Sequence, residues 1–242
     1  MSIIVQKFGG SSVASTEKLF KVCEHIAEEY NKGNQVAVVV SAQGKTTDKL
    51  VSEEKEITLE PNKREHDILL SAGEQITSAK LAMCLEKLGY KAISYMGWQV
   101  PIVTDNMHGE AMIKSINTRK IADKLNKGNI VIVAGFQGID EEGDITTLGR
   151  GGSDTTAASL AAALKAEKCE IFTDVDGVYT ADPNSDPKAK KLETITYDEM
   201  LKLANTGAKV LHNRSVEIAK ESNVPMVVKS TFDKNKTGTI IN

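Results

Sequence analysis

Two glycine-rich segments carry residues whose types and spacing suit the binding of an anion. The first, KFGGSS at 7–12, follows an apolar run, and the second, GRGGSD at 149–154, precedes an alanine-rich run. Glycines let backbone N–H groups approach a ligand closely, and N–H groups at the start of a helix attract negative charge. Arg150 adds a planar guanidinium that suits a carboxylate or a phosphate, while Lys7 and Lys209 add two positive charges. Together they indicate a phosphorylated ligand such as ATP and a second, anionic substrate.

A third segment, VVVSAQGKTTD at 38–48, runs from an apolar stretch into Gly44-Lys45-Thr46 and so has to be tested as a P-loop. The P-loop pattern GxxxxGK[ST] requires a glycine at position 39, where this chain has a valine. Without that glycine, the loop loses part of the freedom needed to curl successive N–H groups around a phosphate. A P-loop protein also needs an apolar strand that ends in an aspartate for Mg²⁺. No apolar run here ends in Asp-Glu, and only EIFTD, which ends in Asp174, comes near that pattern. We therefore expect a different use for this loop.

The segment FTDVDGVYTADP at 172–183 combines acidic residues with a tyrosine. Asp174, Asp176 and Asp182 are numerous enough for Ca²⁺, but the EF-hand spacing and its closing glutamate are absent. Contact with the base and ribose of a nucleotide fits the same residues equally well.

The elements that must position these segments alternate between strands and helices. Uninterrupted apolar runs such as QVAVVVSA predict strands covered on both faces, and apolar residues at helical spacing predict the helices. We predict a three-layer α/β sandwich with a mostly parallel central sheet, whose ligands bind beyond the carboxyl ends of the strands. Ser153 or Asp154 is the predicted N-cap of the alanine-rich helix. The predicted strands are 3–8, 35–42, 91–95, 100–104, 129–136, 169–175, 225–230 and 238–241. The predicted helices are 15–30, 64–88, 118–128, 153–167, 198–206 and 213–222. Residues 138–149 are predicted as a hairpin, and 52–66 as a surface loop with room for one helical turn.

Composition excludes several classes of protein. The 242 residues carry a net charge of −3, which gives no basic surface for nucleic acid and no anchor for a membrane. The three cysteines are scattered, and the four histidines lack metal-ligand spacing, so we expect reduced thiols and no metal site built by the protein. The N-terminus does not resemble a signal peptide, and the apolar runs are far too short to span a bilayer. We expect a cytoplasmic protein of a single domain.

Seven segments in the same order resemble the aspartokinase branch of the amino acid kinase family. This resemblance implies an αβα sandwich that transfers the γ-phosphoryl group of ATP to the side-chain carboxylate of L-aspartate. The product would be 4-phospho-L-aspartate, the first intermediate toward lysine, threonine and methionine. It also implies that residues 1–150 mainly bind the amino acid and 151–242 mainly bind the nucleotide. The segments are KFGGSS, VVVSAQGKTTD, LLSAGE at 69–74, GFQG at 135–138, TTLGRGGSDTTA at 146–157, FTDVDGVYTADP and GAKVLH at 207–212.

The resemblance assigns roles residue by residue. Arg150 would bind a carboxylate of aspartate, Glu74 its α-ammonium group, and Thr47 and Ser153 would donate hydrogen bonds to it. Asp154 would orient Lys7 or a water bound to Mg²⁺, while Mg²⁺ itself would sit mainly on the phosphate oxygens of ATP. Lys7 and the backbone amides of Gly9 and Gly10 would stabilise the transferred phosphoryl group. The remaining nucleotide contacts would be Ser11, Thr173, Asp174, Tyr179, Lys209 and Val210.

Two departures and two alternatives accompany this interpretation. Aspartokinases commonly continue into paired ACT regulatory domains, and this sequence stops at TGTIIN, so we expect no such domains in it. Position 184, often basic in relatives, is Asn184 here. A sister kinase acting on acetylglutamate, glutamate, carbamate or UMP would use the same fold, and so would a non-catalytic binding subunit. We expect a homodimer.

Overall fold

The structure is a computed structural model, and it describes all residues except 182–185, 187, 207–209 and 234–235. The first half of the chain forms β1 (Ile3–Phe8), α1 (Thr16–Asn31), β2 (Gln35–Val40), α2 (Thr46–Ile57), α3 (Lys63–Lys87), β3 (Ala92–Tyr95), β4 (Ile102–Thr104), β5 (Ile113–Ile116) and α4 (Arg119–Asn126). The second half forms β6 (Ile130–Ala134), β7 (Gln137–Ile139), β8 (Ile145–Thr147), α5 (Gly152–Leu164), β9 (Lys168–Thr173), β10 (Thr194–Ile195), α6 (Tyr197–Thr206), α7 (Asn213–Glu221), β11 (Met226–Ser230) and β12 (Thr239–Ile241).

The predicted central sheet is confirmed. Its eight strands lie in the order β10-β12-β11-β9-β1-β2-β6-β3, and among these the β11–β12 pair alone is antiparallel. The strands β2 and β6 are buried almost throughout, as their uninterrupted apolar sequences predict. Because β1 lies between β9 and β2, its carboxyl end is surrounded by other strand ends.

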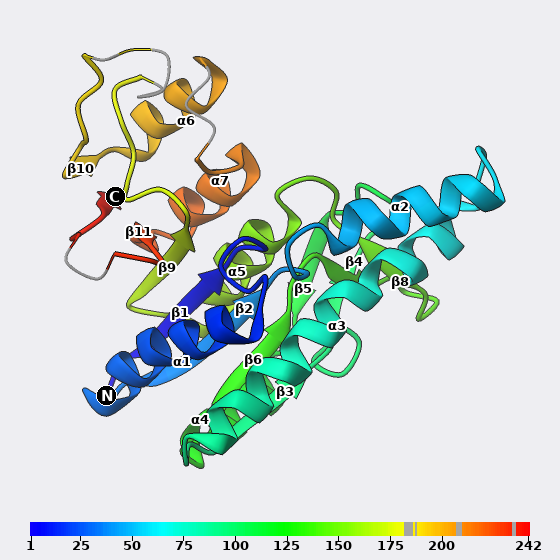
Figure 1. Cartoon of the computed structure of the whole chain (residues 1–242), viewed down its shortest axis with the longest axis horizontal. Helices are drawn as coiled ribbons and strands as arrows, with labels where there is room; N and C mark the ends of the chain where they lie inside the picture. Colours follow the sequence, from blue (N-terminus) through cyan, green and yellow to red (C-terminus); the bar gives the residue numbers. More distant parts are fainter. Residues whose placement is uncertain (182–185, 187, 207–209, 234–235) are drawn as a thin grey trace.

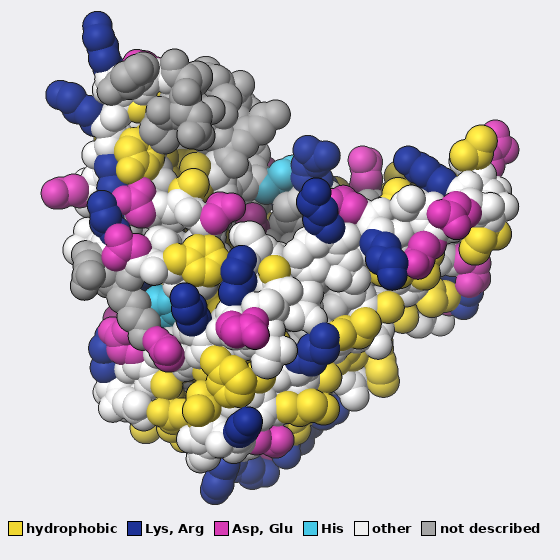
Figure 2. Space-filling model, in the orientation of Figure 1, with side chains coloured by type: hydrophobic (Ala, Val, Ile, Leu, Met, Phe, Trp, Pro, Cys, Tyr) yellow, Lys and Arg dark blue, Asp and Glu magenta, His cyan; other side chains and the backbone are white. Residues whose placement is uncertain are grey.

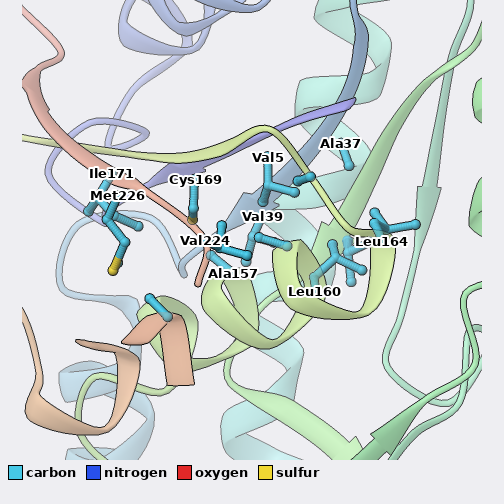
Figure 3. Packing of buried hydrophobic residues seen from close by; sticks show 14 of the residues in the cluster. Val5, Ala37, Val39, Ala157, Leu160, Leu164, Cys169, Ile171, Val224 and Met226 are labelled. Atoms are coloured by element: carbon cyan, nitrogen blue, oxygen red, sulfur yellow. The ribbon is translucent and has the colours of Figure 1, made fainter. Parts of the chain in front are cut away.

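Helices cover both faces of this sheet, which makes three layers (Figure 1). On one face, α1 packs against β1 and β2, and α3 packs against β3 and β6. On the other face, α5 packs against β1, β2 and β9, and α7 lies beside α5. Figure 3 shows Ala157, Leu160 and Leu164 of α5 against Val5 and Val39 of the sheet.

The side chains of β1 point alternately to the two faces of the sheet, and this alternation determines which face its polar residues occupy. Phe8 belongs to the core between the sheet and the α1 side, whereas Val5 belongs to the core on the α5 side. Successive side chains of a strand point to opposite faces, so Lys7 shares the α5 face with Val5. The one lysine of β1 is therefore directed toward the start of α5.

A second, four-stranded sheet has the order β5-β4-β7-β8. The predicted hairpin is confirmed as the antiparallel pair β7–β8, with Gly143 at positive φ near its turn. The strand β5 was not predicted, because its four residues are too few to show a period and are all exposed or half-buried. This sheet leads directly into the Gly149–Asp154 segment.

Two local predictions are wrong. Residues 52–66 were predicted as a surface loop with room for one helical turn, but residues 52–57 are the second half of the three-turn helix α2; the start of α3 agrees with the helix predicted from residue 64. The apolar period is weak there because α2 docks through a polar contact, in which His66 Nδ1 lies 2.7 Å from Oε1 of the buried Glu54. The N-cap of α5 is Gly151, with φ of 72°, and Ser153 and Asp154 lie inside the first turn instead.

The structure also bears on the predicted reduced cysteines and on the length of the apolar segments. All three cysteines are free and buried. Over the part of the chain that the structure describes, no helix combines the length and apolarity needed to cross a membrane.

Candidate active site

A cavity of about 280 Å³ lies where the carboxyl ends of β1 and β2 meet the start of α5. It brings together most of the residues that the sequence singled out for the amino acid and the phosphoryl group. Its lining consists of Lys7, Gly10, Ser41, Ala42, Gly44, Thr47, Glu74, Phe136 and the whole segment Gly149–Asp154.

Lys7 and Asp154 form an ion pair in the lining of this cavity. The Nζ atom of Lys7 lies 2.7 Å from Oδ1 of Asp154, and the two side chains are 11% and 13% exposed. Asp154 stands in the first turn of α5, where the helix dipole favours an acidic side chain. The pair holds the lysine ammonium group at a fixed point facing the cavity.

The glycines of the first loop allow two chain segments to touch. A Cβ atom on Gly10 would lie 2.8 Å from the Ala42 carbonyl oxygen, and the Gly10 carbonyl oxygen accepts a hydrogen bond from Gly44 N–H at 2.9 Å. Gly9 N–H donates to the Phe172 carbonyl oxygen at the end of β9. The loops after β1, β2 and β9 thus meet around Lys7. Gly44-Lys45 leads into α2 as it would in a P-loop, but Val39, which lies inside β2 where that pattern needs a glycine, still argues against a P-loop.

Glu74 is the buried carboxyl group of the cavity, and it comes from the middle of α3. Its side chain is 3% exposed; Oε1 accepts a hydrogen bond from Ala42 N–H at 2.9 Å, and Oε2 has no partner among the described residues. Burial raises the pKa of Glu74 to about 7, and the bond from Ala42 only partly opposes this rise. A cationic group placed at Oε2 would restore the charged carboxylate.

The other three predicted contacts of the amino acid also line the cavity. Arg150 is exposed on a turn between Gly149 and Gly151, both at positive φ, and its guanidinium has no ion pair with any described residue. Ser153 is 7% exposed in the first turn of α5, and Thr47 is half-buried in the first turn of α2. The four predicted contacts of the amino acid therefore offer a cation, a carboxyl group and two hydroxyl groups.

Apart from Lys7 and Gly10, the predicted nucleotide contacts that the structure describes are not part of the lining of this cavity. Thr173 and Asp174 follow β9, where Thr173 Oγ1 donates to Asp174 Oδ1 at 3.1 Å. Tyr179 donates its hydroxyl hydrogen to Asp176 Oδ1 at 2.8 Å. Ser11 accepts a hydrogen bond from Lys18 Nζ through its carbonyl oxygen, Val210 packs on the core of the α5 face, and Lys209 lies outside the described residues.

The calcium interpretation of segment 172–183 finds no support. Asp176 is engaged by Tyr179 and lies 3.7 Å from Lys191 Nζ and 3.4 Å from Lys236 Nζ, which leaves no acidic cage. Asp182 lies outside the described residues. Within the described ranges, no group of three or more His, Cys, Asp or Glu residues could hold a metal ion.

Two contributors to the cavity lie in segments that the sequence singled out after strands, but they were assigned no role in the site. Phe136 lines it with a positive φ of 69°, and its N–H donates to Thr156 Oγ1. Ala42 supplies the N–H that holds Glu74. Neither residue type carries a functional signal, although both follow buried strands, where ligand-binding loops of such sheets are found.

The arrangement can bind a zwitterion next to a phosphate. Glu74 would meet an ammonium group, Arg150 a carboxylate, and Lys7 with the neighbouring backbone N–H groups a transferred phosphoryl group. The site thus has the charges and the position expected of an α/β protein that binds a charged small molecule and an anion at the ends of parallel strands.

The comparison with known families agrees with this class. Residues 2–230 match the model of the amino acid kinase family, and the chain belongs to that family. It is 58% identical over 241 residues to an aspartokinase of Bacillus sp. (strain MGA3), covering 100% of this chain and 58% of that protein. The chain thus spans between one half and two thirds of the length of this relative.

Solved structures of similar proteins support the fold. The structure of aspartate kinase from Synechocystis is 47% identical, with a TM-score of 0.87, over 98% of this chain and 39% of that one. The structure of E. coli aspartokinase III in complex with aspartate and ADP is 29% identical, with a TM-score of 0.89, over 99% of this chain and 64% of that one.

Proposed function

We propose that this chain carries the catalytic domain of an aspartate kinase. It would transfer the γ-phosphoryl group of ATP to the side-chain carboxylate of L-aspartate and give 4-phospho-L-aspartate, the first step toward lysine, threonine and methionine. The buried Glu74, whose Oε2 lacks a partner in a cavity that also holds Arg150, is the observation that carries the proposal. The relatives named above support the choice of aspartate.

The reaction asks little of the protein beyond positioning and charge. A carboxylate with an ordinary pKa near 4 is already ionised at pH 7, so the nucleophile needs no general base. The ammonium group of Lys7, oriented by Asp154, would stabilise the charge on the phosphoryl oxygens as the bond to ADP breaks. Gly10, which lines the cavity, would bring its backbone N–H group to the same oxygens, and Gly9 would do so only by releasing its hydrogen bond to the Phe172 carbonyl oxygen.

Aspartate would lie mainly on residues 1–150 and ATP mainly on residues 151–242. Glu74 and Arg150 would hold the ammonium group and a carboxylate, with Thr47 and Ser153 as hydroxyl donors. Thr173, Asp174, Tyr179, Lys209 and Val210 would line the path of the nucleotide beyond β9.

Mg²⁺ would neutralise charge on the phosphates of ATP. The donor set fits a metal held mainly by those phosphates, because the described residues form no acidic cluster and Asp154 is the one carboxylate beside Lys7 in the cavity. Asp154 would then contact the metal through a bound water.

A hydroxamate assay tests the proposal. ATP, Mg²⁺ and hydroxylamine are supplied with L-aspartate, L-glutamate, N-acetylglutamate or UMP in turn, and both ADP and hydroxamate are measured. We expect both products with aspartate alone. Lys7→Ala should lose roughly 10²–10³-fold in kcat, by analogy with the loss of one preorganised donor.

The other outcomes separate the alternatives. N-acetylglutamate has no free ammonium group for Glu74, so turnover with it would keep the fold and contradict the assigned substrate. ATP binding without turnover of any acceptor would indicate a binding subunit. Near-normal kcat in Lys7→Ala would contradict the role of that lysine.

We propose further that the chain forms a homodimer through α3. Figure 2 shows hydrophobic side chains along the edge of the molecule that α3 forms, and Ile68, Ile76 and Met83 are 37%, 50% and 65% exposed. With Ile76 on a two-fold axis, Ile68 of one copy would approach Met83 of the other. Two antiparallel copies of α3 would also place Lys87 opposite Glu65, since both lie 11 residues from Ile76.

Light scattering tests the dimer. The wild-type chain should have twice the monomer mass, and Ile76→Asp should have the mass of a monomer. Met112→Asp, at a similarly exposed position outside α3, is the control and should remain dimeric. A monomeric wild-type chain would contradict the proposal.

A further inference from the structure

The position of Arg150 depends on what holds the turn beneath it. The turn is short, with φ of 71° at Gly149 and 72° at Gly151, and the arginine has no ion pair with a described residue. A side chain that is not itself restrained can present its charge reproducibly only if its backbone is fixed. The residues that fix Thr147 and Leu148 therefore bear on the cavity.

Asp67 of α3 holds the strand that leads into this turn. Its side chain is fully buried; Oδ2 accepts from Thr147 N–H at 3.0 Å and from Gly109 N–H at 3.1 Å, and Oδ1 accepts from the Thr147 hydroxyl at 2.6 Å. His108 Nδ1 lies 2.8 Å from Oδ2. A buried carboxylate with this many donors is a costly group to build, and it fixes the segments that it joins.

Arg214 of α7 holds the same turn from its other side. Its Nη1 donates to the Leu148 carbonyl oxygen at 3.1 Å and to the Ala111 carbonyl oxygen at 3.2 Å. Ala111 N–H in turn donates to the Thr147 carbonyl oxygen at 2.9 Å. Thr147 and Leu148, which lie three and two residues before Arg150, are thus held by α3 and α7 together.

One helix also carries both Asp67 and Glu74. They lie seven residues apart, two turns of α3, so they project from the same side of the helix about 10.5 Å apart along its axis. The helix therefore fixes Glu74 directly and the Arg150 turn through Asp67. Neither Asp67 nor Arg214 lines the cavity.

We infer that Asp67 and Arg214 are positioning residues that set where the Arg150 guanidinium stands relative to Glu74, and so determine the affinity for an amino acid substrate. They act on the carboxylate through Arg150 and do not touch the substrate. The inference rests on the proposed function, because it concerns the same cavity.

Kinetics of the full chain test the inference. Asp67→Asn and Arg214→Met should each raise KM for L-aspartate about tenfold, the effect of a displaced binding group, with KM for ATP changed by less than about twofold. Thr147→Val removes one donor to Asp67, keeps the backbone, and should show a smaller change in the same direction. Asp123→Asn, at an exposed ion pair of α4, is the matched control and should behave as the wild type.

A double-mutant cycle separates positioning from general damage. If Asp67 acts through Arg150, then Asp67→Asn should have no further effect on kcat/KM for aspartate in an Arg150→Ala background. Additive losses, or equal rises in KM for aspartate and ATP, would overturn the inference. If the wild-type chain binds aspartate without turning it over, the same double-mutant cycle can be measured on Kd for aspartate. If it neither binds nor turns over aspartate, that result contradicts both the proposed function and the inference.

Discussion

At the scale of single residues, the cavity depends on how burial changes an ordinary carboxyl group. Glu74 is separated from water and receives one backbone N–H, which is too little to keep it fully charged near neutral pH. Lys7, Arg150 and Asp154 are the charged groups that share the cavity. An ammonium group at Oε2 would stabilise the charged carboxylate and so lower the pKa of Glu74.

This shift of the pKa predicts a pH dependence of aspartate binding. With the pKa of Glu74 near 7 in the empty protein, the carboxylate is mostly protonated at pH 6 and mostly ionised at pH 8. KM for aspartate should therefore be about tenfold higher at pH 6 than at pH 8, and kcat/KM should report the pKa of the free protein. Glu74→Gln should raise KM and flatten the profile between these pH values; a flat profile in the wild type would contradict the assignment.

At the scale of elements, the site depends on loops whose backbones contact each other closely where one of them carries a glycine. Gly10 brings the loop after β1 against the loop after β2, and a Cβ atom there would meet the backbone oxygen atoms of Ala42 and Gly44 at 2.8 and 3.2 Å. Backbone atoms cannot move aside as a flexible side chain can. Gly9 differs, because the nearest atom to its Cβ position is Nζ of Lys7, at 3.4 Å, which is an ordinary van der Waals distance.

We therefore expect alanine substitutions at the two glycines to lower the free energy of unfolding by different amounts. Gly10→Ala should lower the free energy of unfolding by about 1–3 kcal/mol, as overpacking does, and should separate the loop after β1 from the loop after β2 that carries Ala42. Gly9→Ala is the matched control and should be clearly less destabilising. Urea unfolding of both variants measures the difference, and equal losses would contradict the close approach at Gly10.

At the scale of the whole molecule, a buried ion cluster ties the central strands to each other. Glu170 of β9 is fully buried, and its Oε1 lies 2.7 Å from the Nζ atoms of both Lys168 and Lys229, while Gln6 of β1 donates to Oε2. Burial alone would raise the pKa of Glu170, but the two lysines and Gln6 hold it below its ordinary value. The cluster joins β1, β9 and β11.

Removing this charge should destabilise the fold in a pH-dependent way. Glu170→Gln should cost at most the roughly 3–5 kcal/mol seen when a buried pair is broken, because the two lysines are about one quarter exposed. Because the pKa of Glu170 is lower in the folded state than in the unfolded state, its carboxylate stabilises the fold at pH values above the unfolded pKa near 4.5. That stabilisation disappears as the pH falls through the folded pKa. The difference in unfolding free energy should thus be full at pH 7 and shrink below about pH 4.5. Glu53→Gln, in an exposed ion pair of α2, should show little change at any pH.

The sequence by itself determined the sheet, most helices and the segments that form the cavity. Apolar runs such as β2 and β6 can be buried on both faces only between two layers of helices, and glycine-rich segments after strands mark the ends where ligands bind. These signals are local, so they are legible in one stretch of chain at a time. Lys7, Arg150 and Asp154 were found in this way.

The tertiary structure alone decided which groups share an environment. Glu74 meets Ala42 across 32 residues, and Asp67 meets Thr147 across 80, so neither contact leaves a pattern in any one segment. For the same reason the second half of α2, from residue 52, was predicted as a loop, since this helix docks through the Glu54–His66 contact rather than an apolar face. The raised pKa of Glu74 and the restraint on Arg150 follow from burial and bonding between distant segments, which only the folded chain supplies.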